Sequence, residues 1–304
     1  MAKPNDYSLP ASQRDLVRKH AERALREAGA FGCFPTPISD IVEAAKLVIA
    51  DEHLEEEGLV ARFRRSAKTA GHSLRRALSK VLGVLDTAAR IIYLDRTVHV
   101  AKKAFLKLHE TGHAVLPWQR DIYAITEDCE KTLAPEIADE FEREANTFAA
   151  DVIFQIGAFT EEANQHAFNI LVPVRLSKRY GASIYMSIRR YVTENHRACA
   201  VLVLEPPQYC ATGGFAADFR REVTSPTFRH QFGLLDWPTS FGPGDEIGRL
   251  VPVGGRKMSS PREISLVDRN KVRHRCIAEA FTQGHQVFIL IHAVSTLTRT
   301  RLAV

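Results

Sequence analysis

The sequence predicts an α+β protein, mainly helical over its first two thirds and built of short strands and turns over its last third. Four segments repeat apolar side chains at the spacing of a helix with one buried face: residues 12–28, 37–48, 102–113 and 139–154. A β-branched and aromatic run at residues 90–94 predicts a strand directly before the third helix. From Ala198 onward, short apolar runs are interrupted by Pro and Gly, which is typical of strands joined by turns. The expected strands are residues 200–204, 221–223, 249–253, 263–267 and 286–293.

A chain of 304 residues is long enough for two or three domains, because single domains usually hold about 100–200 residues. We expect a mainly helical domain with a short sheet at residues 1–157, a helical segment at 158–197 and a mixed α+β domain at 198–304. Within the middle segment, residues 176–193 form two predicted helices joined at Gly181, the pattern of a helix-turn-helix. Such pairs bind DNA in some proteins and are plain packing units in others, so DNA contact stays open.

Composition and charge bear on three classes of protein: nucleic-acid-binding, membrane-spanning and disulfide-rich proteins. The net charge of +5 permits contact with nucleic acid without requiring it. A solvated helix face explains the basic segment at residues 62–80 better than a nucleic-acid or substrate-docking surface does. No stretch approaches the ~20 apolar residues that a membrane-spanning helix needs, so we expect a cytoplasmic protein without membrane contact. The five cysteines are widely spaced and form no CxxC pair, which argues against a disulfide framework and a thiolate metal site.

The segment His109-Glu110-Thr111-Gly112-His113 carries the strongest chemical signal in the chain. Positions i and i+4 of a helix lie on one face about one turn apart, so both imidazoles can reach a single metal ion. Glu110 can reach a water on that ion, which suits a catalytic base. Gly112 costs about 1 kcal/mol of helix stability relative to alanine, and its lack of a side chain would let another segment approach closely. The pattern predicts a zinc-hydrolase half-site, although twelve histidines also allow a chance match.

A catalytic zinc usually has three protein ligands and a water, so a third ligand must come from another segment. The helix at residues 139–154 offers Glu142, with Glu144 as the rival. We prefer Glu142 because Asn146 lies four positions later on the same face, where its amide can orient a ligand imidazole. On spacing alone, however, a solvated helix face would explain Glu142 and Asn146 better.

The two helices together resemble the ImmA/IrrE family of metallo-endopeptidases. The marks of that family are a HExGH helix, here residues 109–113, and a downstream E-x-x-A-N-x-F-A-A helix, here residues 142–150, and the order of strand, motif helix and second helix also agrees. The resemblance covers residues 35–195. The C-terminal part is similar only in plan to longer members, which add a sensor domain of GAF type.

This resemblance implies a zincin-like, zinc-dependent endopeptidase. It assigns Zn²⁺ to His109, His113 and Glu142, and the catalytic carboxylate to Glu110. It also implies a protein substrate, a helix-turn-helix (XRE-type) transcriptional repressor, whose cleavage switches on a stress or mobile-element response.

The chain departs from the family pattern at two places. Family members usually continue from the second helix to Leu-Met-Pro, whereas residues 152–157 read VIFQIG, a change expected to alter the local substrate groove. Thr111 stands where an apolar residue is usual, which should leave the zinc geometry intact. The oxyanion of the reaction needs a donor besides zinc, and Tyr123, Tyr180 and His196 stay open for that role.

Two other functions stay open. The chain would be a DNA-binding or regulatory module, with a structural or inactive zinc site, if residues 62–80 and the helix pair at 176–193 contact DNA. Alternatively, the C-terminal domain senses a ligand or partner and controls access to the zinc cleft. The predicted strand at residues 90–94 is in addition a candidate for substrate docking, if one of its edges is free, because a strand edge offers backbone donors and acceptors to an extended peptide.

Overall fold

A computed structural model of the chain describes residues 8–52, 83–86, 90–95, 100–122, 134–210 and 213–294, so the basic segment at 62–80 lies outside the described residues. The predicted α+β class is confirmed. The chain forms two compact units, one of Met1–Phe159 with Lys178–Ser183 and one of Thr160–Ser177 with Ile184–Val304. Each unit is described by itself.

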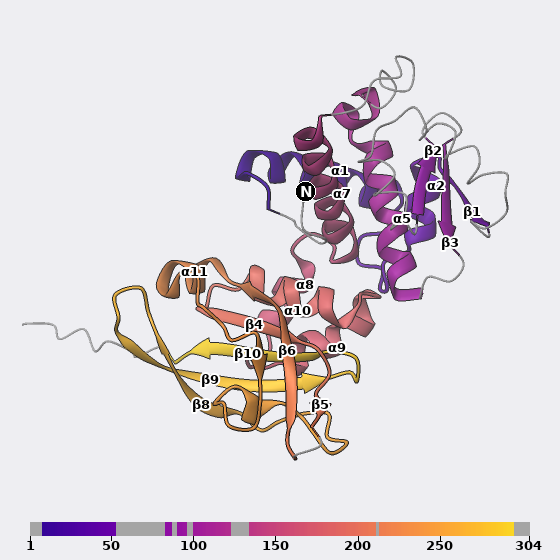
Figure 1. Ribbon diagram of the computed structural model, residues 1–304. Coiled ribbons are helices and arrows are strands. Elements are labelled where there is room, and N and C mark those ends of the chain that lie inside the picture. Colours follow the sequence, from indigo (N-terminus) through magenta and orange to yellow (C-terminus); the bar gives the residue numbers. More distant parts are fainter. Residues whose placement is uncertain are drawn as a thin grey trace, which may run out of the picture. The chain divides into compact units, whose positions relative to one another are not determined.

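The first unit is built around packed helices. Its helices include α1 (Ala11–Glu27), α2 (Ile38–Ala44), α5 (Val100–Val115) and α7 (Pro135–Ile153). α7 packs against α5 on one side and against α1 on the other (Figure 1). Val17, Ala21 and Leu25 are fully buried along α1 at four-residue intervals, as the predicted amphipathic pattern requires.

The second predicted helix is wrong at its C-terminal end. α2 stops at Ala44, Lys46 adopts a φ of 56°, and the N–H of Val48 donates to the Arg90 carbonyl at 3.0 Å. Val48–Glu52 therefore form strand β1 instead of a third helical turn. Pairing with a neighbouring strand outweighs the helical spacing of Val48, a β-branched residue that favours strands.

A three-stranded sheet lies beside α5 in the order β1-β3-β2 (Figure 1). β3 (Ile91–Asp95) is the strand predicted before the motif helix, and it pairs parallel with β1 and antiparallel with β2 (Gly83–Asp86). Ile92 and Leu94 are fully buried in a cluster with Val42 and Ala114. Because β3 is central, both its edges are paired, so the free edge on which substrate docking at this strand depends is not present.

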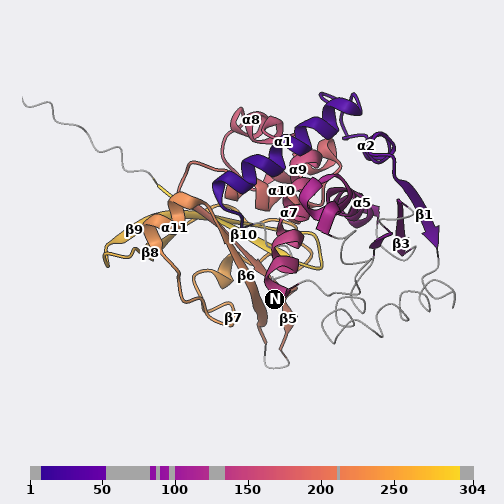
Figure 2. The same ribbon diagram turned by 90° about the horizontal axis from the view of Figure 1, so that it is seen from above.

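The second unit contains one antiparallel sheet in the order β5-β6-β4-β10-β9-β8, with β7 paired to β6. Its strands are β4 (Cys199–Leu204), β5 (Gln208–Tyr209), β6 (Phe215–Thr224), β7 (Ser240–Phe241), β8 (Arg262–Val267), β9 (Arg273–Thr282) and β10 (Val287–Ala293). β8 and β9 form a long hairpin (Figure 2).

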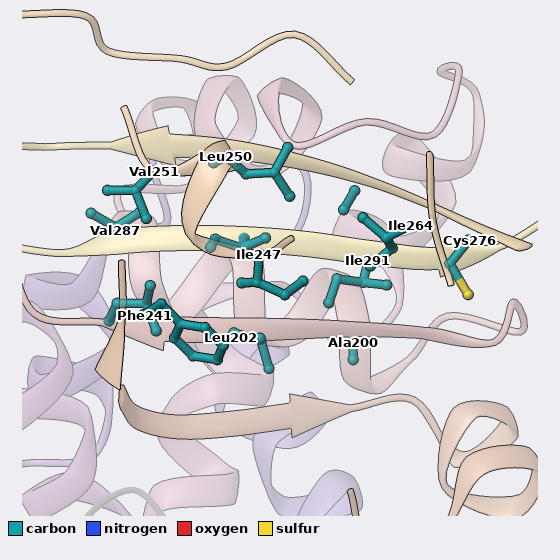
Figure 3. Packing of buried hydrophobic residues seen from close by; sticks show 14 of the residues in the cluster. Ala200, Leu202, Phe241, Ile247, Leu250, Val251, Ile264, Cys276, Val287 and Ile291 are labelled. Carbon is teal, nitrogen blue, oxygen red and sulfur yellow. The ribbon is translucent and has the colours of Figure 1, made fainter. Parts of the chain in front are cut away.

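One face of this sheet carries the apolar core of the second unit. Figure 3 shows Ile247, Leu250 and Val251 packed over side chains of the sheet, among them Leu202 and Ile291. Helix α11 (Pro226–Phe232) contributes Phe228 and Phe232 to the same cluster. The strand predicted at 249–253 is wrong, because this segment begins in a 3-10 turn, η1 (Gly248–Leu250), and Leu250 and Val251 both enter the core. Pro252 also has no N–H to donate to a ladder.

Helices contact the sheet from the segment predicted as a helix-turn-helix. After α8 (Ala158–Asn164), α9 (Leu171–Tyr180) and α10 (Ile184–Thr193) follow each other through a turn at Gly181, whose φ is 67°. α10 packs on β4 and β6, and Tyr185 stacks on Phe288 of β10. Arg190 is 9% exposed and pairs with Glu194 at 3.1 Å. The second helix of the pair is therefore largely occupied by contacts within its own unit.

None of the helices in the described part of the chain combines the length and the apolarity that crossing a bilayer requires.

Candidate metal centre

Three side chains from α5 and α7 gather at one point. His109 and His113 lie one turn apart on α5, are both buried, and bring their Nε2 atoms within 3.2 Å of each other. Glu142 on α7 places Oε2 3.3 Å from the Nε2 of His109 and Oε1 3.6 Å from the Nε2 of His113. The side chain of Glu142 is 51% exposed, so the cluster reaches solvent on the carboxylate side.

The dimensions of this triangle fit a divalent cation. Tetrahedral zinc with ligands at about 2.0–2.1 Å holds those ligands about 3.3–3.4 Å from one another, close to the three separations observed here. Two imidazoles and a carboxylate are also a known donor set of catalytic zinc. The residues present therefore suit the metal that the sequence predicts.

Hydrogen bonds on the far side of both rings define which nitrogens face the cluster. The Nδ1 of His109 lies 3.1 Å from Asn146 Oδ1, and the Nδ1 of His113 lies 2.6 Å from Gln119 Oε1. An amide oxygen only accepts hydrogen bonds, so each Nδ1 carries a proton, and in the neutral ring each Nε2 presents a lone pair. Two such lone pairs 3.2 Å apart repel each other unless a proton or a metal cation lies between them. This arrangement favours a cation site.

The pKa values of His109 and Glu142 reflect how close these two side chains lie to each other. Burial alone would lower the pKa of His109, but the hydrogen bond and negative charge of Glu142, together with the charge of Glu110, raise it. Burial alone would raise the pKa of Glu142, but the hydrogen bond to His109 and the positive charge of both histidines lower it to about 2. The carboxylate is thus ionised over the whole range in which it could serve as a ligand.

Glu144, the rival ligand, faces a different set of partners. It is 1% exposed and accepts hydrogen bonds from Trp118 Nε1 at 2.7 Å, from Gln119 Nε2 and from Gln13 Nε2. Among the described residues, the potential metal-binding group consists of His109, His113 and Glu142 without it. Gln119 had not been expected at the site, because a single glutamine just beyond the end of α5 belongs to no spacing pattern.

Gly112 explains how the two ligand-bearing helices come together. A Cβ added to Gly112 would lie 3.2 Å from the Cα of Ala145 and 3.2 Å from Cδ1 of Phe148, both on α7. Ordinary carbon contacts are about 3.5–4.0 Å, so a side chain here would press directly on the backbone of α7. The close approach that the glycine in the motif predicts is confirmed.

The two departures from the family pattern have local structural roles. Thr111 is fully buried, and its hydroxyl donates to the Lys107 carbonyl at 2.7 Å. Gln155, just past α7, is buried with a φ of 47°. Its amide accepts from the N–H of Gly32 and donates to the carbonyls of Ala30 and Cys33, which ties the loop after α1 to the end of α7.

The residues left open as oxyanion donors fall in different places. Tyr123 lies outside the described residues. Tyr180 is 2% exposed, and its ring packs against Phe34 and Phe159 in the interior of the first unit. His196 belongs to the second unit, where its carbonyl accepts a hydrogen bond from Thr227. Glu110 is 8% exposed on α5, next to the first histidine of the cluster.

The packing of α5 against α7 joins an i, i+4 histidine pair to a carboxylate, a set of side chains that could hold a metal ion as in metallopeptidases. Comparison with known families agrees: residues 54–190, a little under half of the chain, match the model of the IrrE N-terminal-like domain of the M78 peptidases. The resemblance to ImmA/IrrE proteins is therefore confirmed.

Among solved structures, the chain is similar to a Mycobacterium tuberculosis transcriptional regulator. The match covers 96% of this chain and 98% of the other, with 13% sequence identity and a TM-score of 0.50. At this identity the likeness concerns the fold alone. No curated protein matches the sequence.

Proposed function

We propose that this protein is a zinc-dependent endopeptidase in which His109, His113 and Glu142 hold the metal. The observation that carries the proposal is the pair of inward-facing Nε2 atoms, 3.2 Å apart, with the Glu142 carboxylate 3.3 and 3.6 Å away. Such a cluster of ligand atoms would be unfavourable in a purely structural helix contact, because it places atoms with the same partial charge close together. The match of residues 54–190 to a peptidase family model supports hydrolysis as the reaction.

The chemistry divides between the metal and this chain. A bound Zn²⁺ ion supplies Lewis acidity, which activates a water and polarises a peptide carbonyl. Glu110 takes the proton from the attacking water and later delivers it to the amine nitrogen of the leaving peptide. Asn146 and Gln119 hold the two imidazoles in the orientation that directs Nε2 toward the ion.

The proposed substrate is a helix-turn-helix (XRE-type) transcriptional repressor in the cytoplasm, whose cleavage starts a stress or mobile-element response. Resemblance to ImmA/IrrE proteins supports this substrate. We keep the division into a zincin-like domain at 1–157, a helical segment at 158–197 and a GAF-like sensor domain at 198–304 as part of the proposal. The single antiparallel sheet of the second unit is compatible with a sensor role.

Purified protein provides the test. We expect about one zinc per chain by elemental analysis and zinc-dependent cleavage of a repressor encoded beside the gene. Glu110→Gln should retain zinc and lose about 10²–10⁴-fold in cleavage rate, because only the proton-transfer group is removed. Glu142→Ala, the matched variant at the metal, should lose both zinc and cleavage. Unchanged cleavage by Glu110→Gln would reject the catalytic assignment, and absence of bound zinc would reject the site.

The alternative, a DNA-binding module with a structural or inactive zinc site, gains no support from the helix pair. Met186, Ile188 and Tyr191 of α10 are buried, and Arg190 is paired with Glu194. A DNA-binding second helix usually presents its side chains to the major groove. A salt-dependent mobility shift of duplex DNA that chelation leaves unchanged would nevertheless favour this alternative.

A further inference from the structure

A chain of buried hydrogen bonds runs from His113 away from the metal cluster. Gln119 is fully buried; its Oε1 accepts from His113 Nδ1, and its Nε2 donates to Glu144 Oε2 at 2.5 Å and to the Phe141 carbonyl at 3.2 Å. Trp118 Nε1 donates to the same oxygen of Glu144 at 2.7 Å. The four side chains and the carbonyl form a continuous path behind the imidazole.

The direction of the Gln119 amide follows from the chemistry of its neighbours. A carboxylate and a backbone carbonyl both accept hydrogen bonds and have no proton to give. The two N–H protons of the Gln119 amide satisfy these two acceptors, so its oxygen must point the other way, toward His113. A flipped amide would place its oxygen against two acceptor oxygens in a site without solvent.

The orientation of the Gln119 amide affects the metal cluster through the His113 ring. An oxygen facing Nδ1 requires the proton to be on Nδ1, which leaves Nε2 unprotonated and directed at His109 and Glu142. If the amide presented its NH₂ group instead, Nδ1 would have to accept, and the proton would move to Nε2. A protonated Nε2 cannot bind a metal ion.

We propose that Glu144, acting through Gln119, is a positioning residue that fixes the tautomer of His113 and so keeps its Nε2 available to a metal ion. The inference rests on the proposed metal site. Trp118 and Gln13 complete the role, because their N–H groups occupy acceptor positions of Glu144 and hold the carboxylate in place. His109 has its own partner, Asn146, and does not depend on this path.

Three variants test the proposal. Gln119→Met keeps the length of the side chain and removes the acceptor, and Glu144→Gln removes the acceptor-only group that orients the amide. Glu140→Gln is the matched control, because Glu140 also lies on α7 and accepts from Gln13 but does not touch Gln119. Each variant is checked for folding by circular dichroism, and if Gln119→Met does not fold, Glu144→Gln decides.

Two measurements are made on the full chain. Zinc affinity, by competition with a chromophoric chelator, should fall about 10–100-fold for Gln119→Met and about 10-fold for Glu144→Gln, and stay unchanged for Glu140→Gln. ¹⁵N chemical shifts of the metal-free protein should show His113 protonated on Nδ1 in the wild type and shifted toward Nε2 in Gln119→Met and Glu144→Gln. Glu140→Gln serves as the reference and should show the wild-type shifts.

The outcomes separate this inference from the proposed function. If the wild type binds zinc and the Gln119 and Glu144 variants keep both the affinity and the Nδ1-protonated His113, the positioning role is overturned while the metal site stands. If the wild type binds no zinc, the metal site fails, and the His113 tautomer in the metal-free variants still decides the role of Glu144.

Discussion

Replacing Gly112 by alanine tests whether the close approach of α5 and α7 holds the metal cluster together. The added Cβ would lie 3.2 Å from the Cα of Ala145, which is backbone and cannot rotate away. Relief therefore requires α7 to move by at least about 0.3 Å, the shortfall from the shortest ordinary carbon contact of about 3.5 Å. Glu142 lies three residues before Ala145 on α7, so the same movement draws its carboxylate away from both imidazoles.

The expected cost combines two opposing effects. Overpacking of this kind destabilises a protein by about 1–3 kcal/mol, whereas alanine in place of glycine within a helix contributes about 1 kcal/mol of stability. The net loss of unfolding free energy should be about 0–2 kcal/mol. Zinc binding requires the two helices to return to their close approach. The whole overpacking cost therefore lowers the affinity for zinc, by about 5–150-fold.

Zinc affinity and thermal unfolding of Gly112→Ala are measured beside those of Thr111→Ala. The Thr111 variant loses a buried hydrogen bond on the same helix but adds no atom facing α7, so it should lose stability without losing affinity. If Gly112→Ala binds zinc as tightly as the wild type and gains about 1 kcal/mol in stability, the helices do not need this contact and the reasoning is refuted.

Three further outcomes are expected. Zinc at a hundred times its Kd should raise the free energy of unfolding by about 2.7 kcal/mol, and an unchanged melting temperature would contradict binding to the folded state. Gln155→Ala should cost about 1–3 kcal/mol, because the groups of the loop after α1 lose their buried partner, while zinc affinity measured in parallel stays constant. In the metal-free protein, the His109–Glu142 pair should stabilise the fold fully between pH 4.5 and 6.5. Because the pKa of Glu142 is lowered, this stabilisation decreases as pH falls from 4.5 toward 2. Because the pKa of His109 is raised, it also decreases as pH rises above 6.5. If the melting temperatures of the wild type and of Glu142→Gln differ by the same amount at every pH, this linkage is excluded.

Local patterns were sufficient to predict the parts of the fold that bring the cluster together. The apolar spacing of α1, α5 and α7 and the β-branched run of β3 are signals carried by neighbouring residues. The spacing of His109 and His113, and the shared face of Glu142 and Asn146, follow from helix geometry once the helices are assigned. Gly112 also gave a direct indication of close packing, because glycine is unfavourable within a helix.

Features that depend on distant partners could not be predicted in this way. Val48 continues the helical pattern of α2, and only its pairing with β3 turns it into a strand residue. Residues 249–253 look like a strand, but their apolar side chains cover a sheet built from other segments. Gln119 contacts His113 and Glu144 only in the tertiary structure. No sequence motif identifies a buried amide whose role depends on its orientation.

Because α10 is buried, the position at which the protein is truncated should affect its solubility. The family match ends at residue 190, within α10, whereas α10 packs on β4 and β6 of the C-terminal sheet. A truncated protein that stops at the family boundary would expose Met186 and Ile188 to water, a sticky apolar surface that promotes aggregation. The family match therefore ends inside a packed helix, and insolubility of such a fragment would reflect the cut rather than a defect of the metal site.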